Sequence, residues 1–236
     1  RDAGPVMVFY HGGGFVIGDL ETHEPYCTQA AAQLDMPVIA IDYRLAPEHP
    51  YPAAPDDCEA ATRWIADNFP CTGLILSGDS AGGNLTIVTT MALRDNPAAV
   101  PVLVQHPIYP VVTDSNDWQS MRDFAEGFLL TRDSMDYFHA AYAADADDYR
   151  GAPIKFSQEG MPPSLVTTAS LDPLRDQGLA YVEALKAAGV PVQHRSADGN
   201  IHGHITLRKG IPSSKEDVAG NLAALKAMLA EVMADA

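Results

Sequence analysis

A serine at position 80 lies in the pentapeptide Gly-Asp-Ser-Ala-Gly of residues 78–82, a G-x-S-x-G motif. The apolar run 74–77 comes directly before it. This order of strand, glycine and serine is typical of a nucleophile elbow, a sharp turn that presents the serine hydroxyl at the end of a strand. A serine hydroxyl is a poor nucleophile by itself, so the prediction also requires a base, an acid and N–H donors for an oxyanion.

A base and an acid have candidates further along the chain. Asp172 follows the apolar run 164–171, and His202 lies after the last run with strand character. The order Ser, Asp, His along the chain is that of α/β-hydrolases. Other residues in comparable positions remain alternatives, namely Asp176 and Asp198 for the acid and His194 and His204 for the base.

The oxyanion donors have a candidate in residues 11–15, His-Gly-Gly-Gly-Phe, which follow the first apolar run. Glycines allow the backbone to approach a substrate closely and to aim N–H groups at it. No Gly-Lys-Ser/Thr sequence follows and no G-x-G-x-x-G opens a helix, so a phosphate loop is disfavoured. In an α/β-hydrolase, such a loop acts together with the N–H of the residue after the nucleophile, here Ala81.

Short apolar runs alternate with segments of helical periodicity, and these elements must position the polar residues. The predicted strands are 5–11, 37–43, 73–79, 101–109, 164–171 and 191–197, and the predicted helices are 24–34, 55–68, 81–94, 134–144, 177–188 and 214–234. Unbroken apolar runs indicate parallel strands buried on both faces. The alternation predicts an α/β fold with a mostly parallel sheet and helices on both faces, in which ligands bind at the carboxyl ends of the strands.

Length and composition restrict the class of protein. The 236 residues fit a single catalytic domain, residues 1–236. The long segment 113–156 is rich in Asp and aromatic residues, and we predict that it is a helical insertion that contributes to the cover of the site.

The formal charge is −16 and no run of Lys or Arg occurs, which disfavours nucleic acid and anionic membranes as partners. We find no apolar stretch long enough to span a membrane.

The three cysteines, Cys27, Cys58 and Cys71, do not have the spacing of metal ligands. Free thiols indicate a reducing compartment, so we expect a cytoplasmic protein. A small molecule is the expected partner.

Taken together, the motifs resemble the hormone-sensitive-lipase group of bacterial carboxylesterases. The matching segments are 11–15, 42–48, 78–83, 172–176 and 201–203. The resemblance implies an α/β-hydrolase fold and hydrolysis of short- to medium-chain carboxylic esters, with no metal or cofactor. It implies Ser80 as nucleophile, Asp172 as acid and His202 as base. It also implies that Gly13, Gly14 and Ala81 supply the oxyanion hole.

The sequence departs from this group beside the predicted base, where Asn200 and His204 replace apolar or aromatic residues. We therefore expect a more polar wall of the substrate pocket there. The residues predicted to line this pocket are Phe15, Asp79 and His204.

The sequence also lacks the helical cap and the two strands that usually precede the segment equivalent to 5–11. Without them, the strand 37–43 is expected at the edge of the sheet, where an exposed apolar strand tends to pair with another chain. We expect either a truncated form or a homodimer that covers this edge.

Two other functions fit the same residues. A truncated chain could be weakly active, or could bind a ligand without turning it over. An amidase or thioesterase would use the same serine, histidine and aspartate, because the shape of the pocket selects the bond that is cleaved.

Overall fold

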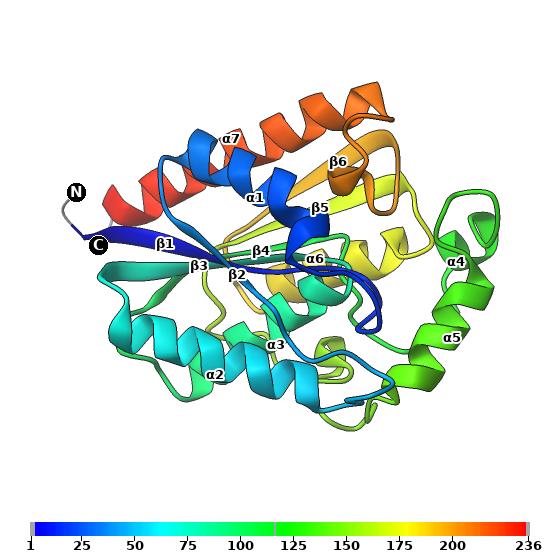
Figure 1. The fold of residues 1–236 in the computed structure, drawn as a ribbon, viewed down its shortest axis with the longest axis horizontal. Helices are drawn as coiled ribbons and strands as arrows, with labels where there is room; N and C mark the ends of the chain where they lie inside the picture. Colours follow the sequence, from blue (N-terminus) through cyan, green and yellow to red (C-terminus); the bar gives the residue numbers. More distant parts are fainter. Residues whose placement is uncertain (1–2, 116, 235–236) are drawn as a thin grey trace.

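The protein is described by a computed structural model that covers residues 3–115 and 117–234. The predicted domain 1–236 and the predicted insertion 113–156 thus each include positions outside the described residues. The described chain folds into a six-stranded parallel sheet in the order β2-β1-β3-β4-β5-β6 (Figure 1). Its strands are β1 (Gly4–Tyr10), β2 (Val38–Ile41), β3 (Cys71–Asp79), β4 (Val102–Ile108), β5 (Ser164–Leu171) and β6 (Val192–Ile201). The predicted parallel α/β fold is confirmed.

Helices cover both faces of the sheet. They are α1 (Leu20–Leu34), α2 (Ala53–Asn68), α3 (Ala81–Asp95), α4 (Gln119–Asp123), α5 (Arg132–Tyr142), α6 (Arg175–Ala187) and α7 (Pro212–Ala234), with short 3-10 turns η1 (Pro153–Lys155) and η2 (His204–Thr206). Helices α1 and α7 lie on one face, and α2 and α3 lie on the other (Figure 1). Helices α4 and α5 stand at the end of the sheet where β1 ends, which is the carboxyl end of the parallel strands (Figure 1).

Alternation along the central strands builds two separate cores. In β1, the side chains of Val6 and Val8 pack on the face of α2 and α3, whereas Met7 and Phe9 pack on the face of α1 and α7. Successive side chains of a strand point to opposite faces, so a strand covered by helices on both faces must be apolar throughout. This is why β1 is an unbroken apolar run, and residues 6–10 are fully buried.

Helix α3 is buried over nearly its whole length, from Ala81 to Leu93. Its residues are mostly small or β-branched, and the hydroxyls of Thr86 and Thr90 donate to the carbonyls four residues earlier, at 2.8 and 2.7 Å. A buried hydroxyl must be hydrogen-bonded to avoid a large desolvation penalty. Helix α3 can therefore lie against the sheet without unpaired hydroxyls at these two positions.

Helix α1 begins four residues before the predicted start at Glu24. Asp19 and Thr22 form a capping box, in which the Thr22 N–H donates to Asp19 Oδ1 at 2.7 Å and the Asp19 N–H donates to Thr22 Oγ1 at 3.0 Å. Two otherwise unpaired N–H groups are satisfied in this way. Pro25 consequently lies inside the helix and not at its start.

The strand β2 lies at the edge of the described sheet, as the sequence predicts. Its residues Val38, Ile39 and Ala40 are only half-buried, in contrast to those of β1. At the opposite edge, β6 continues to Ile201 and is longer than the predicted strand 191–197. Among the described residues, no helix combines the length and apolar character needed to cross a membrane.

The central position of β3 leads to a stability prediction. Leu76 is fully buried in β3, so we expect Leu76→Ala to lower the free energy of unfolding by about 2–5 kcal/mol. Trp64 on α2 is 62% exposed, and Trp64→Ala serves as the control, with an expected change within about 0.5 kcal/mol. Urea denaturation measures both. Equal losses in the two variants would contradict the assignment of the core.

Candidate active site

Ser80 stands in the turn between β3 and α3 with φ of 57°, a left-handed conformation that is unusual for a residue with a side chain. The Ser80 N–H donates to the carbonyl of Ile108 at 2.9 Å, which fixes the turn to the end of β4. A Cβ on Gly82 would lie 1.9 Å from the carbonyl oxygen of Tyr10 in β1. The turn can approach β1 only because residue 82 is glycine, and this geometry is that of a nucleophile elbow.

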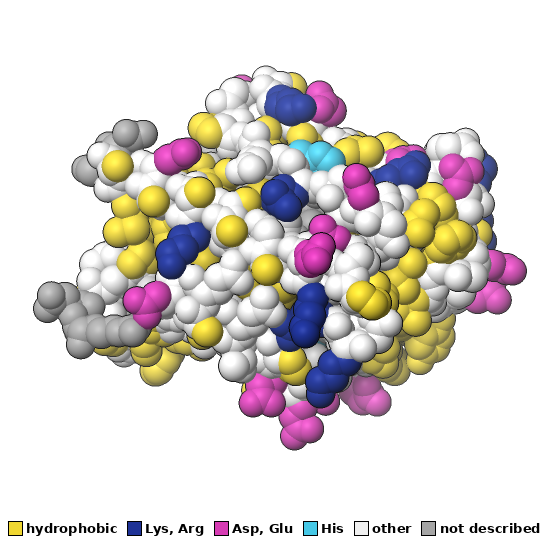
Figure 2. Space-filling view, turned by 90° about the horizontal axis from the view of Figure 1, so that it is seen from above, with side chains coloured by type: hydrophobic (Ala, Val, Ile, Leu, Met, Phe, Trp, Pro, Cys, Tyr) yellow, Lys and Arg dark blue, Asp and Glu magenta, His cyan; other side chains and the backbone are white. Residues whose placement is uncertain are grey.

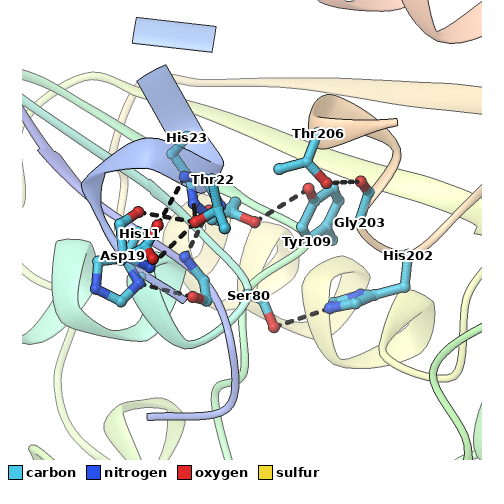
Figure 3. Close-up of polar contacts among 12 residues, drawn as sticks. His11, Asp19, Thr22, His23, Ser80, Tyr109, His202, Gly203 and Thr206 are labelled. Atoms are coloured by element: carbon cyan, nitrogen blue, oxygen red, sulfur yellow. Dashed lines mark hydrogen bonds and ion pairs between the residues drawn. The ribbon is translucent and has the colours of Figure 1, made fainter. Parts of the chain in front are cut away.

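The three residues predicted as nucleophile, base and acid form one hydrogen-bonded chain. His202 Nε2 lies 2.8 Å from Ser80 Oγ, and His202 Nδ1 lies 2.7 Å from Asp172 Oδ2 (Figure 3 shows the Ser80–His202 contact). Asp172 is fully buried, and its other oxygen accepts the Leu174 N–H at 2.8 Å. Such an arrangement can remove the serine proton and stabilise the imidazolium that forms.

The alternative acids and bases lie elsewhere. Asp176 accepts the N–H of Ser120 at 2.8 Å, and Asp198 accepts the hydroxyl of Ser196. His194 lies 2.9 Å from the Thr168 hydroxyl in the neighbouring strand. These residues hold local structure, and none of these contacts within the described residues involves Ser80.

The loop after β1 lines the same cavity as Ser80, through residues 12–15. Gly14 has φ of 62°, and a Cβ there would lie 2.4 Å from the ring of Phe138 on α5. Phe15 also has a positive φ, and its ring stacks on Tyr142 with a centroid distance of 3.8 Å and an angle of 5°. The loop is thus held between the elbow and α5.

Asp79, the residue before the nucleophile, lines the cavity, and its carboxylate ties the elbow to the glycine loop. Asp79 Oδ1 accepts the Gly12 N–H at 2.7 Å and lies 3.0 Å from His23 Nε2. Asp79 Oδ2 accepts the Tyr109 hydroxyl at 3.2 Å. Figure 3 shows His23 reaching this cluster from α1, on the opposite side from His202.

The electrostatics of this cluster follow from burial and pairing. Burial alone would raise the pKa of Asp79, but the charge of His23 and the Gly12 N–H outweigh it and keep that pKa below its usual range. Burial alone would lower the pKa of His23, but Asp79 outweighs it and raises that pKa. The pair is therefore charged over a wider range of pH than two isolated side chains would be.

The prediction of a more polar pocket wall at His204 and Asn200 is wrong. His204 is fully buried, lies edge-on against the Tyr109 ring at a centroid distance of 5.3 Å, and does not line the cavity. Burial lowers the pKa of His204 to about 4, so it is neutral at physiological pH. Asn200 is also fully buried, and its side chain donates to Asp217 of α7 and accepts the Ser213 hydroxyl at 3.1 Å. Both side chains are therefore buried in the fold and do not face the cavity.

The cavity at Ser80 has a volume of about 650 Å³ and is mostly apolar. The apolar side chains that line it are Phe15, Ile17, Val111, Leu129, Leu130, Met135, Phe138 and Leu174. Four of these belong to the predicted insertion 113–156. No Lys or Arg is among the described residues that line the cavity.

The surface at this end of the molecule is also apolar. Figure 2 shows hydrophobic side chains gathered at the end where α4 and α5 lie. Ile17 and Leu129, which line the cavity, are 57% and 62% exposed. The mouth of the cavity therefore has an apolar rim.

A metal site would need clustered ligands. Within residues 3–115 and 117–234, no group of three or more His, Cys, Asp or Glu side chains is arranged to hold a metal ion.

Comparison with known proteins agrees with this geometry. The sequence profile of the alpha/beta hydrolase fold matches residues 7–206. Carboxylesterase NlhH of Mycobacterium tuberculosis is 38% identical over 97% of this chain, which spans 75% of that protein. The chain belongs to the hormone-sensitive-lipase-like family of α/β-hydrolases.

Two further members place the chain within this family. Carboxylic ester hydrolase LipN of Mycobacterium tuberculosis is 40% identical over 98% of the chain, which spans 65% of LipN. The crystal structure of an esterase from Pyrobaculum calidifontis has a TM-score of 0.90 and 38% identity, and covers 97% of this chain and 79% of its own. The shared part includes all the elements that carry Ser80, Asp172 and His202.

Sequence reasoning missed two residues of the site, His23 and Tyr109. His23 belongs to the buried stripe of α1, with Tyr26, Ala30 and Leu34. A histidine in such a stripe requires a polar partner, and this signal could have drawn attention to it. Tyr109 follows β4 with φ of 34° and gave no comparable signal in the sequence.

The contact of Gly14 with α5 leads to a prediction. Gly14→Ala places a methyl group against the Phe138 ring and strains the loop, so we expect a fluorophosphonate probe to label Ser80 about 10²-fold more slowly, the effect of losing one oxyanion donor. Gly189→Ala is the matched control, because Gly189 also has a positive φ (72°) but no atom within 4 Å of its Cβ position. Labelling at equal rates in the two variants would contradict the role of the loop.

Proposed function

We propose that this protein is a serine carboxylesterase that hydrolyses short- to medium-chain carboxylic esters. The observation that carries the proposal is the hydrogen-bonded chain from Asp172 through His202 to Ser80, which ends in an apolar cavity. The names of its relatives NlhH and LipN, a carboxylesterase and a carboxylic ester hydrolase, support the same class of reaction.

The proposed reaction proceeds through an acyl-enzyme. Ser80 Oγ attacks the ester carbonyl while His202 Nε2 takes the hydroxyl proton, and Asp172 holds the imidazole in the correct tautomer. His202 then gives the proton to the leaving alcohol as the bond between carbonyl carbon and alcohol oxygen breaks. Water repeats the sequence, releases the carboxylic acid and restores the Ser80 hydroxyl.

The developing negative charge of the tetrahedral intermediate needs N–H donors. Ala81 is the first residue of α3, and the first N–H groups of a helix have no partner within it. We assign the remaining donors to Gly13 and Gly14, because their loop lines the same cavity as Ser80 and is fixed by Asp79 and Phe138. Such pre-aligned donors stabilise charge without reorganisation during the reaction.

The lining of the cavity supports small neutral esters as substrates. Its side chains are mainly apolar, no Lys or Arg is among the described residues that line it, and the Asp79 carboxylate is paired with His23. A carboxylate on the acyl chain would find no Lys or Arg among the described residues of the lining. We therefore propose that the substrate is a small ester with an uncharged acyl group.

We further propose that the protein is cytoplasmic, which is consistent with Cys27, Cys58 and Cys71 as free thiols.

We also propose that a second copy of the chain covers the edge strand β2. Half-buried apolar side chains such as Ile39 leave this edge able to pair. We expect light scattering at several concentrations to show a dimer that Ile39→Lys converts to a monomer. A monomer at all concentrations of the unaltered chain would contradict the dimer.

Ser80→Ala tests the catalytic proposal. We expect kcat on p-nitrophenyl butanoate to fall on the order of 10⁶-fold, because the nucleophile is lost while the fold is kept. Ser196→Ala is the control, since Ser196 is exposed and its hydroxyl bonds only to Asp198 among the described residues; it should leave kcat unchanged.

A panel of p-nitrophenyl esters from two to twelve acyl carbons, with matched anilides and thioesters, defines the bond and the chain length. We expect the highest kcat/KM on esters of short to medium chains. Preference for anilides or thioesters would identify an amidase or thioesterase with the same triad. Binding without turnover across the panel would favour a ligand-binding protein.

A further inference from the structure

His23 belongs neither to the triad nor to the proposed oxyanion donors. It contacts Asp79, however, which directly precedes Ser80 and accepts the N–H of Gly12 in the glycine loop. It projects from the first turns of α1, is 5% exposed, and lines the cavity. Its Nδ1 lies 2.9 Å from the Thr22 hydroxyl, and its Nε2 lies 3.0 Å from Asp79 Oδ1. One ring nitrogen is therefore fixed by the capped helix, and the other lies within ion-pair distance of the carboxylate.

Asp79 cannot hold its position without donors. It is 3% exposed, and a buried carboxylate needs charge or hydrogen bonds to replace water. Its donors are the Gly12 N–H and the Tyr109 hydroxyl, and His23 is its one ion-pair partner within the described part of the chain. The carboxylate oxygen that contacts His23 is also the one that accepts the Gly12 N–H.

Gly12 links this carboxylate to the oxyanion hole. It immediately precedes Gly13 and Gly14, and a Cβ on Gly12 would lie 2.6 Å from Asp79 Oδ2, so loop and carboxylate are in direct contact. A small rotation of the Asp79 side chain would move the Gly12 N–H and with it the two following N–H groups. Oxyanion donors act only when placed within a few tenths of an ångström of their productive positions.

We propose that His23 is a positioning residue for the oxyanion hole, which acts by holding the Asp79 carboxylate in the orientation that fixes Gly12 and the two following glycines. The proposal rests on the esterase function proposed above. It assigns His23 no contact with the reacting atoms. Its effect should appear in the transition state, where the oxyanion exists, and not in the binding of the ground-state ester.

Two substitutions of similar polarity separate positioning from packing. In His23→Gln, the side-chain amide nitrogen can occupy the place of Nε2 and donate to Asp79. In His23→Asn, the side chain is one bond shorter and its nitrogen lies near the place of Nδ1, out of reach of Asp79. Any loss common to both variants reports changed packing, and the difference between them reports the contact with Asp79.

The experiment measures kcat and KM on p-nitrophenyl butanoate, and titration with a fluorophosphonate gives the concentration of active sites. It also measures the inhibition constant of a boronic acid, which forms a tetrahedral adduct with the nucleophile. For His23→Asn, we expect kcat to fall about 10- to 100-fold, part of the loss caused by removing one donor. We expect KM to stay within about threefold and the boronic acid to bind more weakly by the same factor as the fall in kcat. His23→Gln should restore kcat to within about fivefold of the unaltered enzyme.

Three outcomes would overturn the proposal: an unchanged kcat per active site in His23→Asn, an equal loss in the two variants, or a loss confined to KM. His194→Gln is the control for replacing a partly buried, hydrogen-bonded histidine, because His194 contacts Thr168 away from the cavity. If the unaltered chain hydrolyses no ester at all, the proposed function fails instead.

Asp79→Asn keeps the test decisive if His23→Asn does not fold. The amide oxygen can still accept the Gly12 N–H, but the charge that pairs with His23 is gone. We expect this variant to lose kcat, and His23→Ala to lower kcat much less when added to it than when made alone, because the two residues act as one unit. Full additivity of the two losses would contradict the proposal.

Discussion

The close approach of the nucleophile turn to β1 is the constraint on which the rest of the site depends. Gly82 lies so near the Tyr10 carbonyl that no side chain fits between them. This contact places Ser80 beside the point where β1 ends and the glycine loop begins. Ser80 and the glycine loop, the proposed nucleophile and oxyanion donors, are neighbours because two parallel strands, β1 and β3, are adjacent in the sheet and end at the same level.

The buried charges of the site are arranged around this contact. Asp172 and Asp79 both lie below the surface, one behind the base and the other behind the glycine loop. Each carboxylate has a histidine and a backbone N–H as partners, which replaces the hydration that burial removes. The two aspartates thus fix opposite sides of the cavity, while the apolar side chains between them leave room for a substrate.

The sequence predicted the strands and the three residues of the hydrogen-bonded chain because their signals are local. Apolar runs mark buried strands, and Ser80, Asp172 and His202 each follow such a run. The pairing of His23 with Asp79 was not predictable, because residues 56 positions apart meet only through the packing of α1 on the sheet. His204 was misjudged for the same reason: whether a histidine beside His202 faces the cavity or the core depends on Tyr109, which follows β4 and is distant in the sequence.

The position of the Ser80 hydroxyl depends on the tertiary packing around its left-handed turn. The turn persists only while the Ser80 N–H reaches the end of β4 and α3 remains buried behind it. Loosening at the end of β4 would let Ser80 relax to an ordinary conformation and would carry its hydroxyl away from His202 well before the sheet comes apart. Turnover should therefore disappear at lower denaturant concentrations than the far-ultraviolet circular dichroism signal. The fraction of active protein in a preparation is thus a more sensitive measure of native packing around Ser80 than its secondary-structure content.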